Sequence, residues 1–224
     1  MKWVSIYSLK KSSILSIILI FILPLYSLAG STNQWGIKLG VSISTQNFKY
    51  KTSEIDRDFD NYLGLHADAF VNFVDRKTYA FVAQISFSQK GCIETITPTF
   101  VDPVNHGYID GDPIKFRNRT DYLSLSILGK LNLNLNVLNP YIIIGPRIDF
   151  LVNTKSETIP KSIFDNLNRN SFGMTLGIGR EFSLFIPYKT LIEFQYSPDL
   201  TKMYDSQFLS IEKTSYEIKM GITF

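Results

Sequence analysis

The 224-residue sequence predicts an all-β protein, specifically an eight-stranded antiparallel up-and-down transmembrane β-barrel. Segments that alternate apolar side chains with polar, charged or small ones recur along the chain. The connections between them are long and short in turn, and the sequence ends on Phe224 within one such segment. Because successive side chains of a strand point to opposite faces, each segment has one face suited to lipid and one suited to water.

Residues 1–29 are expected to be a secretory signal peptide. Lysines lie near the start, and an apolar run at residues 14–28 ends beside the small residues Ser27 and Ala29, which match a cleavage site. We expect cleavage after Ala29, which leaves residues 30–224 as the outer-membrane β-barrel domain. An uncleaved N-terminal anchor is the alternative, since the run is close to the shortest length that spans a bilayer.

Composition and charge exclude several classes of function. The net charge is +3 and the pI is about 8.8, but lysines in the expected signal account for the excess, so the rest of the chain is near neutral. It has no basic stretch with interleaved aromatic residues, which argues against a nucleic-acid partner. The single cysteine, Cys92, has no disulfide partner and no neighbouring His cluster, so neither metal binding nor catalysis is expected there.

The first four expected strands cover residues 35–44, 63–73, 81–88 and 122–132. In the first strand, the apolar face carries Trp35, Ile37, Leu39, Val41 and Ile43. The second and third strands show the same period of two and are separated by a short connection at residues 75–77. Polar segments at residues 45–61 and 91–120 predict long connections before the second and the fourth strand.

The last four expected strands cover residues 141–150, 172–181, 190–197 and 216–224. Short turns around Pro140 and Pro187 and polar connections at residues 153–170 and 198–205 separate them. Short periplasmic turns that alternate with longer extracellular loops are typical of membrane barrels. A soluble lipocalin-like barrel or sandwich is the alternative, but its apolar face would point inward.

The interior of an eight-stranded barrel is just wide enough for side chains to fill it, so we expect a packed lumen. The charged or titratable side chains on the inward faces are Lys38, His66, Asp68, Lys130, Arg147, Asp149, Glu181, Glu193, Glu217 and Lys219. Because isolated ions in this space would be costly, these groups are expected to pair across the lumen. Two interpretations stay open: a structural polar plug, and a gate that opens to a narrow ion path.

Five motifs resemble the porin-family outer-membrane β-barrel proteins of the PorT-like type, which share the small-barrel plan of the outer membrane protein A type. They lie at residues 35–40, 121–130, 139–146, 172–179 and 216–224. The resemblance implies export to the periplasm and residence in the outer membrane of a Gram-negative cell. It says little about function, although some similar proteins assist secretion or assembly. Ser124 departs from the acidic residue that such a strand often carries, which implies a different lumen network.

The last strand also resembles the signal that the barrel insertion machinery recognises during biogenesis. Its outward face carries the residues of this expected signal, Tyr216, Ile218, Met220, Ile222 and Phe224. Such a strand keeps a free edge that can pair with another sheet until the barrel closes.

Our first functional hypothesis is a non-enzymatic barrel without cofactor, whose lipid-embedded scaffold carries long extracellular loops for binding or a structural role. The alternatives are a narrow ion or small-solute channel, and an accessory factor that meets secretion or assembly components. An extracellular ligand would bind the loops, since binding sites concentrate on loops held by a rigid scaffold. A lipid-modifying enzyme is less favoured, because only His66 and His106 could serve as histidine bases and no nucleophile motif accompanies them.

Overall fold

A computed structural model describes residues 34–51, 59–101, 107–133, 140–157, 167–183 and 188–224. The expected signal peptide, residues 1–29, lies outside the described residues, as does His106. No helix in the described ranges is long and apolar enough to cross a membrane.

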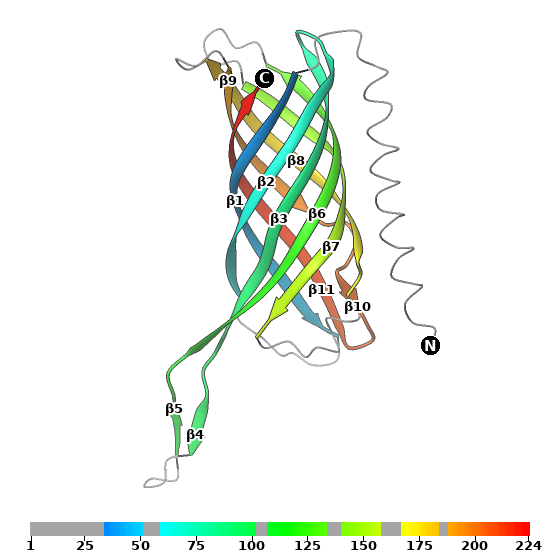
Figure 1. Cartoon of the computed structure of the whole chain (residues 1–224). Helices are drawn as coiled ribbons and strands as arrows, with labels where there is room; N and C mark the ends of the chain where they lie inside the picture. Colours follow the sequence, from blue (N-terminus) through cyan, green and yellow to red (C-terminus); the bar gives the residue numbers. More distant parts are fainter. Residues whose placement is uncertain (1–33, 52–58, 102–106, 134–139, 158–166, 184–187) are drawn as a thin grey trace, which may run out of the picture.

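The described chain forms a tall, closed ring of antiparallel strands (Figure 1). In order around the ring these are β1 (Gln34–Tyr50), β2 (Phe59–Asp75), β3 (Tyr79–Ile96), β6 (Ile114–Asn132), β7 (Pro140–Ser156), β8 (Asn170–Ser183), β9 (Lys189–Pro198) and β11 (Leu209–Thr223). Each of these eight strands pairs with the one that follows it in this order, and β11 pairs back onto β1. The predicted fold class, an eight-stranded up-and-down β-barrel, is confirmed.

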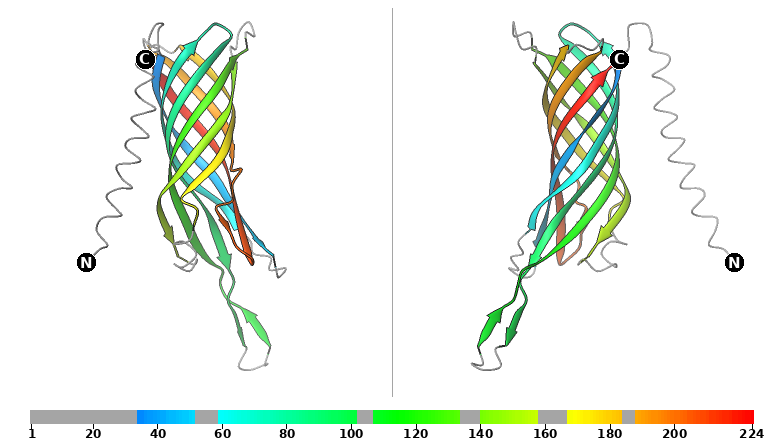
Figure 2. Two further views of the ribbon diagram at one scale, coloured as in Figure 1. Left: turned by 90° about the vertical axis from the view of Figure 1, so that its right-hand side faces the viewer. Right: turned by 60° about the vertical axis from the view of Figure 1, so that its left-hand side comes forward.

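Three further strands lie outside the ring order. β4 (Thr99–Val101) and β5 (Tyr108–Asp110) form a separate hairpin, and β10 (Tyr204–Asp205) pairs with the start of β11. The hairpin projects from one end of the barrel, which we call the long-loop end (Figure 2). The C-terminus and the short β2–β3 connection lie at the opposite, short-turn end (Figure 1).

The seam between β1 and β11 is continuous from Gly36↔Thr223 to Tyr50↔Leu209. Beyond it, the Phe224 N–H donates to the Trp35 carbonyl oxygen at 2.7 Å, and the rings of these two residues stack with centroids 4.5 Å apart. Closure of this seam leaves the ring without a free edge, as a structure inside hydrocarbon requires.

The alternation of faces follows the sequence. Ile37 and Ile218 are 46% exposed on the outer surface, whereas their neighbours Lys38 and Glu217 are 3% and 1% exposed. Aromatic side chains mark both edges of the outer apolar belt. Trp35 and Tyr188 both contact the Phe224 ring near the short-turn end, and Tyr196 packs on Tyr216 farther along. Aromatic girdles of this kind lie at the two membrane interfaces of outer-membrane barrels.

The strands are longer than predicted, and the expectation of a long polar connection at residues 91–120 is wrong in its extent. Residues 91–96 continue β3, residues 114–120 begin β6, and these parts pair with each other up to Ile96↔Ile114. Cross-strand pairing holds them extended although their composition is polar. A tilted strand needs only about 9–11 residues to span a membrane, so strands of 17 to 19 residues project beyond the apolar belt at the long-loop end.

The close approach of β1 and β11 at Gly40 gives a test of the seam. A Cβ at Gly40 would overlap the carbonyl oxygen of Ile218 and lie 2.8 Å from the Cα of Lys219, so the two strands would have to separate locally. We expect Gly40→Ala to lower the free energy of unfolding by about 1–3 kcal/mol, as measured by urea titration of the folded band on unheated gels. The control is Gly129→Ala, whose Cβ would meet only the Ile144 carbonyl oxygen, at 3.7 Å. Equal stability of the two variants would contradict the close approach.

Candidate functional site

The lumen is the candidate site, because the charged side chains that the sequence predicts as inward converge there. Glu181 is half-buried, and the other nine are buried, namely Lys38, His66, Asp68, Lys130, Arg147, Asp149, Glu193, Glu217 and Lys219. Alternation along each strand places them inside. The structure divides them into separate groups along the barrel axis.

The central group joins strands that are not neighbours in the ring. Lys38 of β1 donates from Nζ to Glu193 Oε1 of β9 at 2.8 Å. Lys219 of β11 donates from Nζ to Asp68 Oδ2 of β2 at 2.9 Å. Gln84 and Gln195 accept from the same two lysines, at 2.9 and 2.5 Å. Each ion pair therefore skips one strand of the ring and ties together strands on either side of the β1–β11 seam.

His66 lies inside this group. Its Nε2 is 2.6 Å from Asp68 Oδ1 and 3.2 Å from Lys219 Nζ, and within the described residues its Nδ1 has no hydrogen-bond partner. Within the described residues, the groups at hydrogen-bond distance from Nε2 are this carboxylate and this ammonium. His66 is therefore part of the central ion network.

A second group lies nearer the long-loop end. Arg147 donates from Nε to Asp149 Oδ1 at 2.8 Å and from Nη2 to Asp199 Oδ1 at 2.6 Å. Lys213 lies 3.4 Å from Asp149 Oδ2 and 3.1 Å from Asp199 Oδ2, with its ammonium over the Tyr122 ring. Each of the two cations therefore contacts both carboxylates, and the four side chains form one ion network.

Lys213, Lys90 and Asp199 were missed by the sequence analysis. Lys213 continues the inward alternation of the last strand two steps before Glu217, and Lys90 continues that of β3 beyond Ser88, so longer predicted strands would have included both. Lys90 Nζ lies 3.6 Å from Glu217 Oε1. Asp199 carries no such signal, because it follows the end of β9 and reaches the lumen through an isolated bridge to Gly173.

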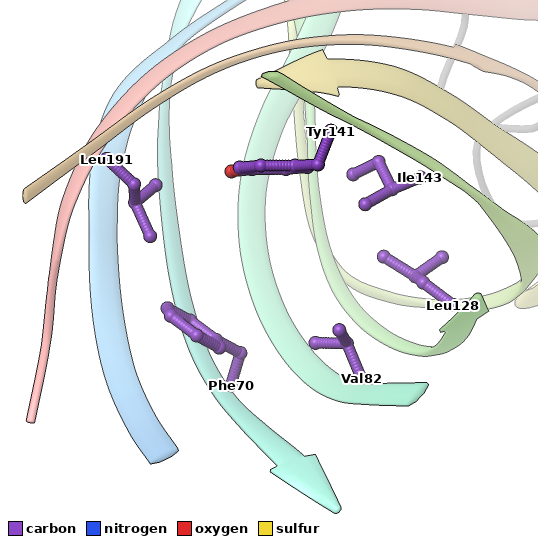
Figure 3. Close-up of a cluster of buried hydrophobic side chains, with 6 residues drawn as sticks. All are labelled: Phe70, Val82, Leu128, Tyr141, Ile143 and Leu191. Carbon is purple, nitrogen blue, oxygen red and sulfur yellow. The ribbon is translucent and has the colours of Figure 1, made fainter. Parts of the chain in front are cut away.

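An apolar layer separates the central group from the short-turn end. It consists of Phe70, Val82, Leu128, Tyr141, Ile143 and Leu191, whose side chains face one another inside the ring (Figure 3). Lys38 lies over the Phe70 ring and Lys130 over the Tyr141 ring, with Nζ 4.9 and 4.3 Å from the centroids. The Tyr141 hydroxyl donates to Glu193 Oε2 at 2.9 Å. The expected filling of polar and charged groups is therefore incomplete: one whole layer is apolar or aromatic.

The free space in the lumen differs sharply on the two sides of this layer. At the short-turn end a cavity of about 670 Å³ opens to solvent, with the Lys130–Glu181 ion pair in its wall and Arg76, Lys77 and Lys189 around it. Between the apolar layer and the Lys38–Glu193 pair only about 10 Å³ remains. A cavity needs roughly 10–15 Å³ to hold one water molecule, so this space has room for one at most.

A second apolar cluster lies at the long-loop end, where Leu167, Met203, Leu209 and Ile211 are buried. Asp205 of β10 lies beside it and is exposed. Hydrogen bonds from Lys51 and Lys202, at 2.7 and 3.2 Å, hold the pKa of the Asp205 carboxyl below its usual value. Among the described residues, no group of three or more His, Cys, Asp or Glu side chains could hold a metal ion.

The central ion pairs give a test of the network. Lys219→Met leaves the buried Asp68 carboxylate without its nearest cation, which should lower the free energy of unfolding by about 3–5 kcal/mol. The control is Lys49→Met, because Lys49 pairs with Glu212 at 2.7 Å on the exposed surface. Loss of such a surface pair should cost less than about 1 kcal/mol. Urea unfolding in detergent micelles measures both, and an equally small effect of the two changes would show that the buried pair is not structural.

Solved structures of three outer-membrane proteins are similar to this chain. Ail, the attachment invasion locus protein of Yersinia pestis, solved with the heparin analogue sucrose octasulfate, is 14% identical, covers 87% of this chain and 100% of its own, and has a TM-score of 0.40. Outer membrane protein AlkL is 9% identical over 88% of this chain and 93% of its own, with a TM-score of 0.38. Outer Membrane Protein W of E. coli is 10% identical over 87% of this chain and 100% of its own, with a TM-score of 0.36.

The comparison with curated proteins found no match. The model of the outer membrane protein beta-barrel domain matches residues 28–205, which is most of the chain. The chain therefore belongs to the outer membrane protein beta-barrel family and is located in the outer membrane of a Gram-negative cell.

Proposed function

We propose that this protein is a non-enzymatic, closed outer-membrane barrel of the PorT-like type, whose lumen is a structural plug and whose long-loop end serves binding. Short turns of outer-membrane barrels are periplasmic, so the long-loop end faces the cell exterior. The mature chain would be residues 30–224, after removal of residues 1–29 behind Ala29.

The observation that carries this proposal is that an apolar layer and a layer of ion pairs follow each other along the barrel axis and fill the lumen. Conduction needs a continuous hydrated path, and the apolar layer is followed directly by the Lys38–Glu193 and Lys219–Asp68 pairs. Opening a path would separate buried ion pairs, which costs several kcal/mol when a partner is lost. A filled lumen therefore favours a scaffold over a pore.

A narrow ion or small-solute channel is the second candidate. The wide cavity at the short-turn end favours it, because Lys130 and Glu181 would form the entrance of a pore whose constriction is the apolar layer. Hydrophobic constrictions can gate a pore by dewetting. The channel would then require movement of Phe70, Tyr141 or Leu191.

The two remaining alternatives have less support. A lipid-modifying enzyme would need a nucleophile beside a base, and the contacts of His66 are Asp68 and Lys219. An accessory role in secretion or assembly follows from the resemblance to PorT-like proteins. The β4–β5 hairpin, with Tyr108 82% exposed, would be the place where such a component or another extracellular ligand binds.

Planar-bilayer recording tests the plug. We expect the wild-type protein to give a flat current trace at several voltages, because the residual space is at the limit of one water molecule. Phe70→Ala combined with Leu191→Ala removes two walls of the apolar layer and should produce a measurable leak. The matched control is Leu39→Ala on the lipid-facing surface, which should leave the trace flat. Stepwise conductance of the wild-type protein would favour the channel.

We also propose that Tyr216, Ile218, Met220, Ile222 and Phe224 act as the signal for the barrel insertion machinery. All five lie on the outer face of the last strand, where that machinery could contact them before closure. We expect Phe224→Ala to slow the appearance of the heat-modifiable folded form in cells more than Leu39→Ala does. Refolding of purified Phe224→Ala into micelles separates the signal from the stacking on Trp35: equally slow refolding there would assign the effect to lost stability.

A further inference from the structure

The solvent-open cavity at the short-turn end, which we call the vestibule, is the largest free space described in the barrel and has no role in the proposed plug. Its volume of about 670 Å³ lies within the range of small-molecule sites, roughly 300–1,000 Å³. Tyr141 lines the vestibule and also belongs to the apolar layer, so the cavity ends at that layer. A solute that enters from the short-turn end is therefore retained there.

One side of the vestibule is formed by the short β2–β3 turn. Asp75, Arg76 and Lys77 line the cavity at this turn, where Asp75 is half-buried and the two cations are exposed. Within the described residues, no oppositely charged group lies within 4.0 Å of any of these three side chains. This side carries two cations and one carboxylate, and both cations can accept an external anion.

The facing side is formed by Lys130 of β6, Glu181 of β8 and Lys189 of β9, which also line the vestibule. Glu181 pairs with Lys130 through Oε1, and its Oε2 lies 3.9 Å from Lys189 Nζ. In the closed ring order, β8 and β9 are four strands away from β2 and β3, which places them on the opposite side of the ring. This side also carries two cations and one carboxylate.

Each side of the vestibule thus has a net charge of +1, and its surroundings do not cancel this charge. Arg180 also lines the cavity, although it follows the outward alternation of β8, and it adds positive charge at the mouth. The neighbouring segments 134–139 and 184–187, which lie outside the described residues, contain no charged residue. An excess of positive charge in a concave site raises the local concentration of anions.

We propose that the vestibule binds elongated dicarboxylates, with one carboxylate on each of the two cationic sides. A dianion of this shape compensates the net charge of each side. The Arg76 guanidinium can bind a carboxylate through two parallel hydrogen bonds, whereas Lys77, Lys130 and Lys189 act as point charges. This site is independent of any binding role of the long-loop end.

The width of the barrel favours a ligand with several carbon atoms between its charges. Eight strands about 4.8 Å apart and tilted by roughly 40° form a ring about 16 Å across, and long side chains from both sides narrow this gap. Leu133, Tyr141 and Phe182 also line the vestibule and offer apolar contacts to methylene groups.

NMR titration of the isotope-labelled, folded protein in zwitterionic micelles tests the proposal. The ligand is pimelate, a straight-chain dicarboxylate, and we expect shifts of the amide signals of Arg76, Lys77, Glu181 and Lys189. Heptanoate has the same number of carbon atoms but one carboxylate. It should bind roughly tenfold more weakly, because each exposed ion pair that it lacks contributes roughly two- to fivefold.

The variant Arg76→Gln with Lys77→Gln removes the cations of one side and leaves the buried ion pairs intact. Pimelate should then bind roughly tenfold more weakly than to wild type. The matched control is Lys115→Gln with Lys155→Gln, which removes the same charge from exposed positions at the long-loop end and should stay within about twofold of wild type. Heat-modifiable gel migration checks that every variant is folded.

A single change on the facing side makes the result decisive. Lys189→Gln, at an exposed position, should weaken pimelate binding about threefold even where the double variant folds poorly. Equal affinity of wild type for pimelate and heptanoate would overturn the proposal, as would unchanged pimelate affinity in the Arg76→Gln, Lys77→Gln variant. Pimelate-induced shifts confined to the long-loop end would also overturn it.

Discussion

The need to pair every backbone N–H and C=O group inside hydrocarbon is the constraint on which the rest of this structure depends. It brings together β1 and β11, which lie at opposite ends of the described chain and pair from Gly36↔Thr223 to Tyr50↔Leu209. On the inward side of the seam two large side chains face glycines: Lys219 opposes Gly40, and Lys38 opposes Gly221. Once the ring is closed, its lumen has a fixed and narrow width, and all inward side chains share that space.

The character of the lumen follows from this confinement. Charged side chains that face inward have little water to hydrate them, so they pair with groups on other strands. The Lys38–Glu193 and Lys219–Asp68 pairs span from β1 to β9 and from β11 to β2, and so they brace the closing seam from inside. Such pairs are weak contributors to net stability, but loss of one partner leaves a buried charge and is costly. The rings of Phe70 and Tyr141 join this network to the apolar layer by lying under Lys38 and Lys130.

Because the strands are longer than the membrane is thick, the barrel has a lipid-embedded half and a half that extends into solvent. The half near the short-turn end is embedded in lipid and holds the apolar layer and the central ion pairs. The half near the long-loop end extends beyond the belt, so its outer face can be polar, and here the ion pairs lie on the surface as well as in the lumen. A scaffold of this kind holds a stable interior and leaves its external half free for interactions.

The period of two along each strand is a local property, and the sequence by itself therefore determined the fold class, the lipid-facing side and the inward position of residues such as Lys38, Asp68 and Glu217. Strand ends were not determined, because the polar composition of residues 91–96 and 114–120 resembles that of a loop and only cross-strand pairing holds them extended. Tertiary structure alone decided which charges meet, since partners across the lumen depend on the stagger between strands that are not neighbours. It also brought Asp199 to Arg147 from beyond the end of β9, and gathered six apolar side chains into one layer. Both arrangements arise from the three-dimensional closure of the ring, which no alternation along a single strand encodes.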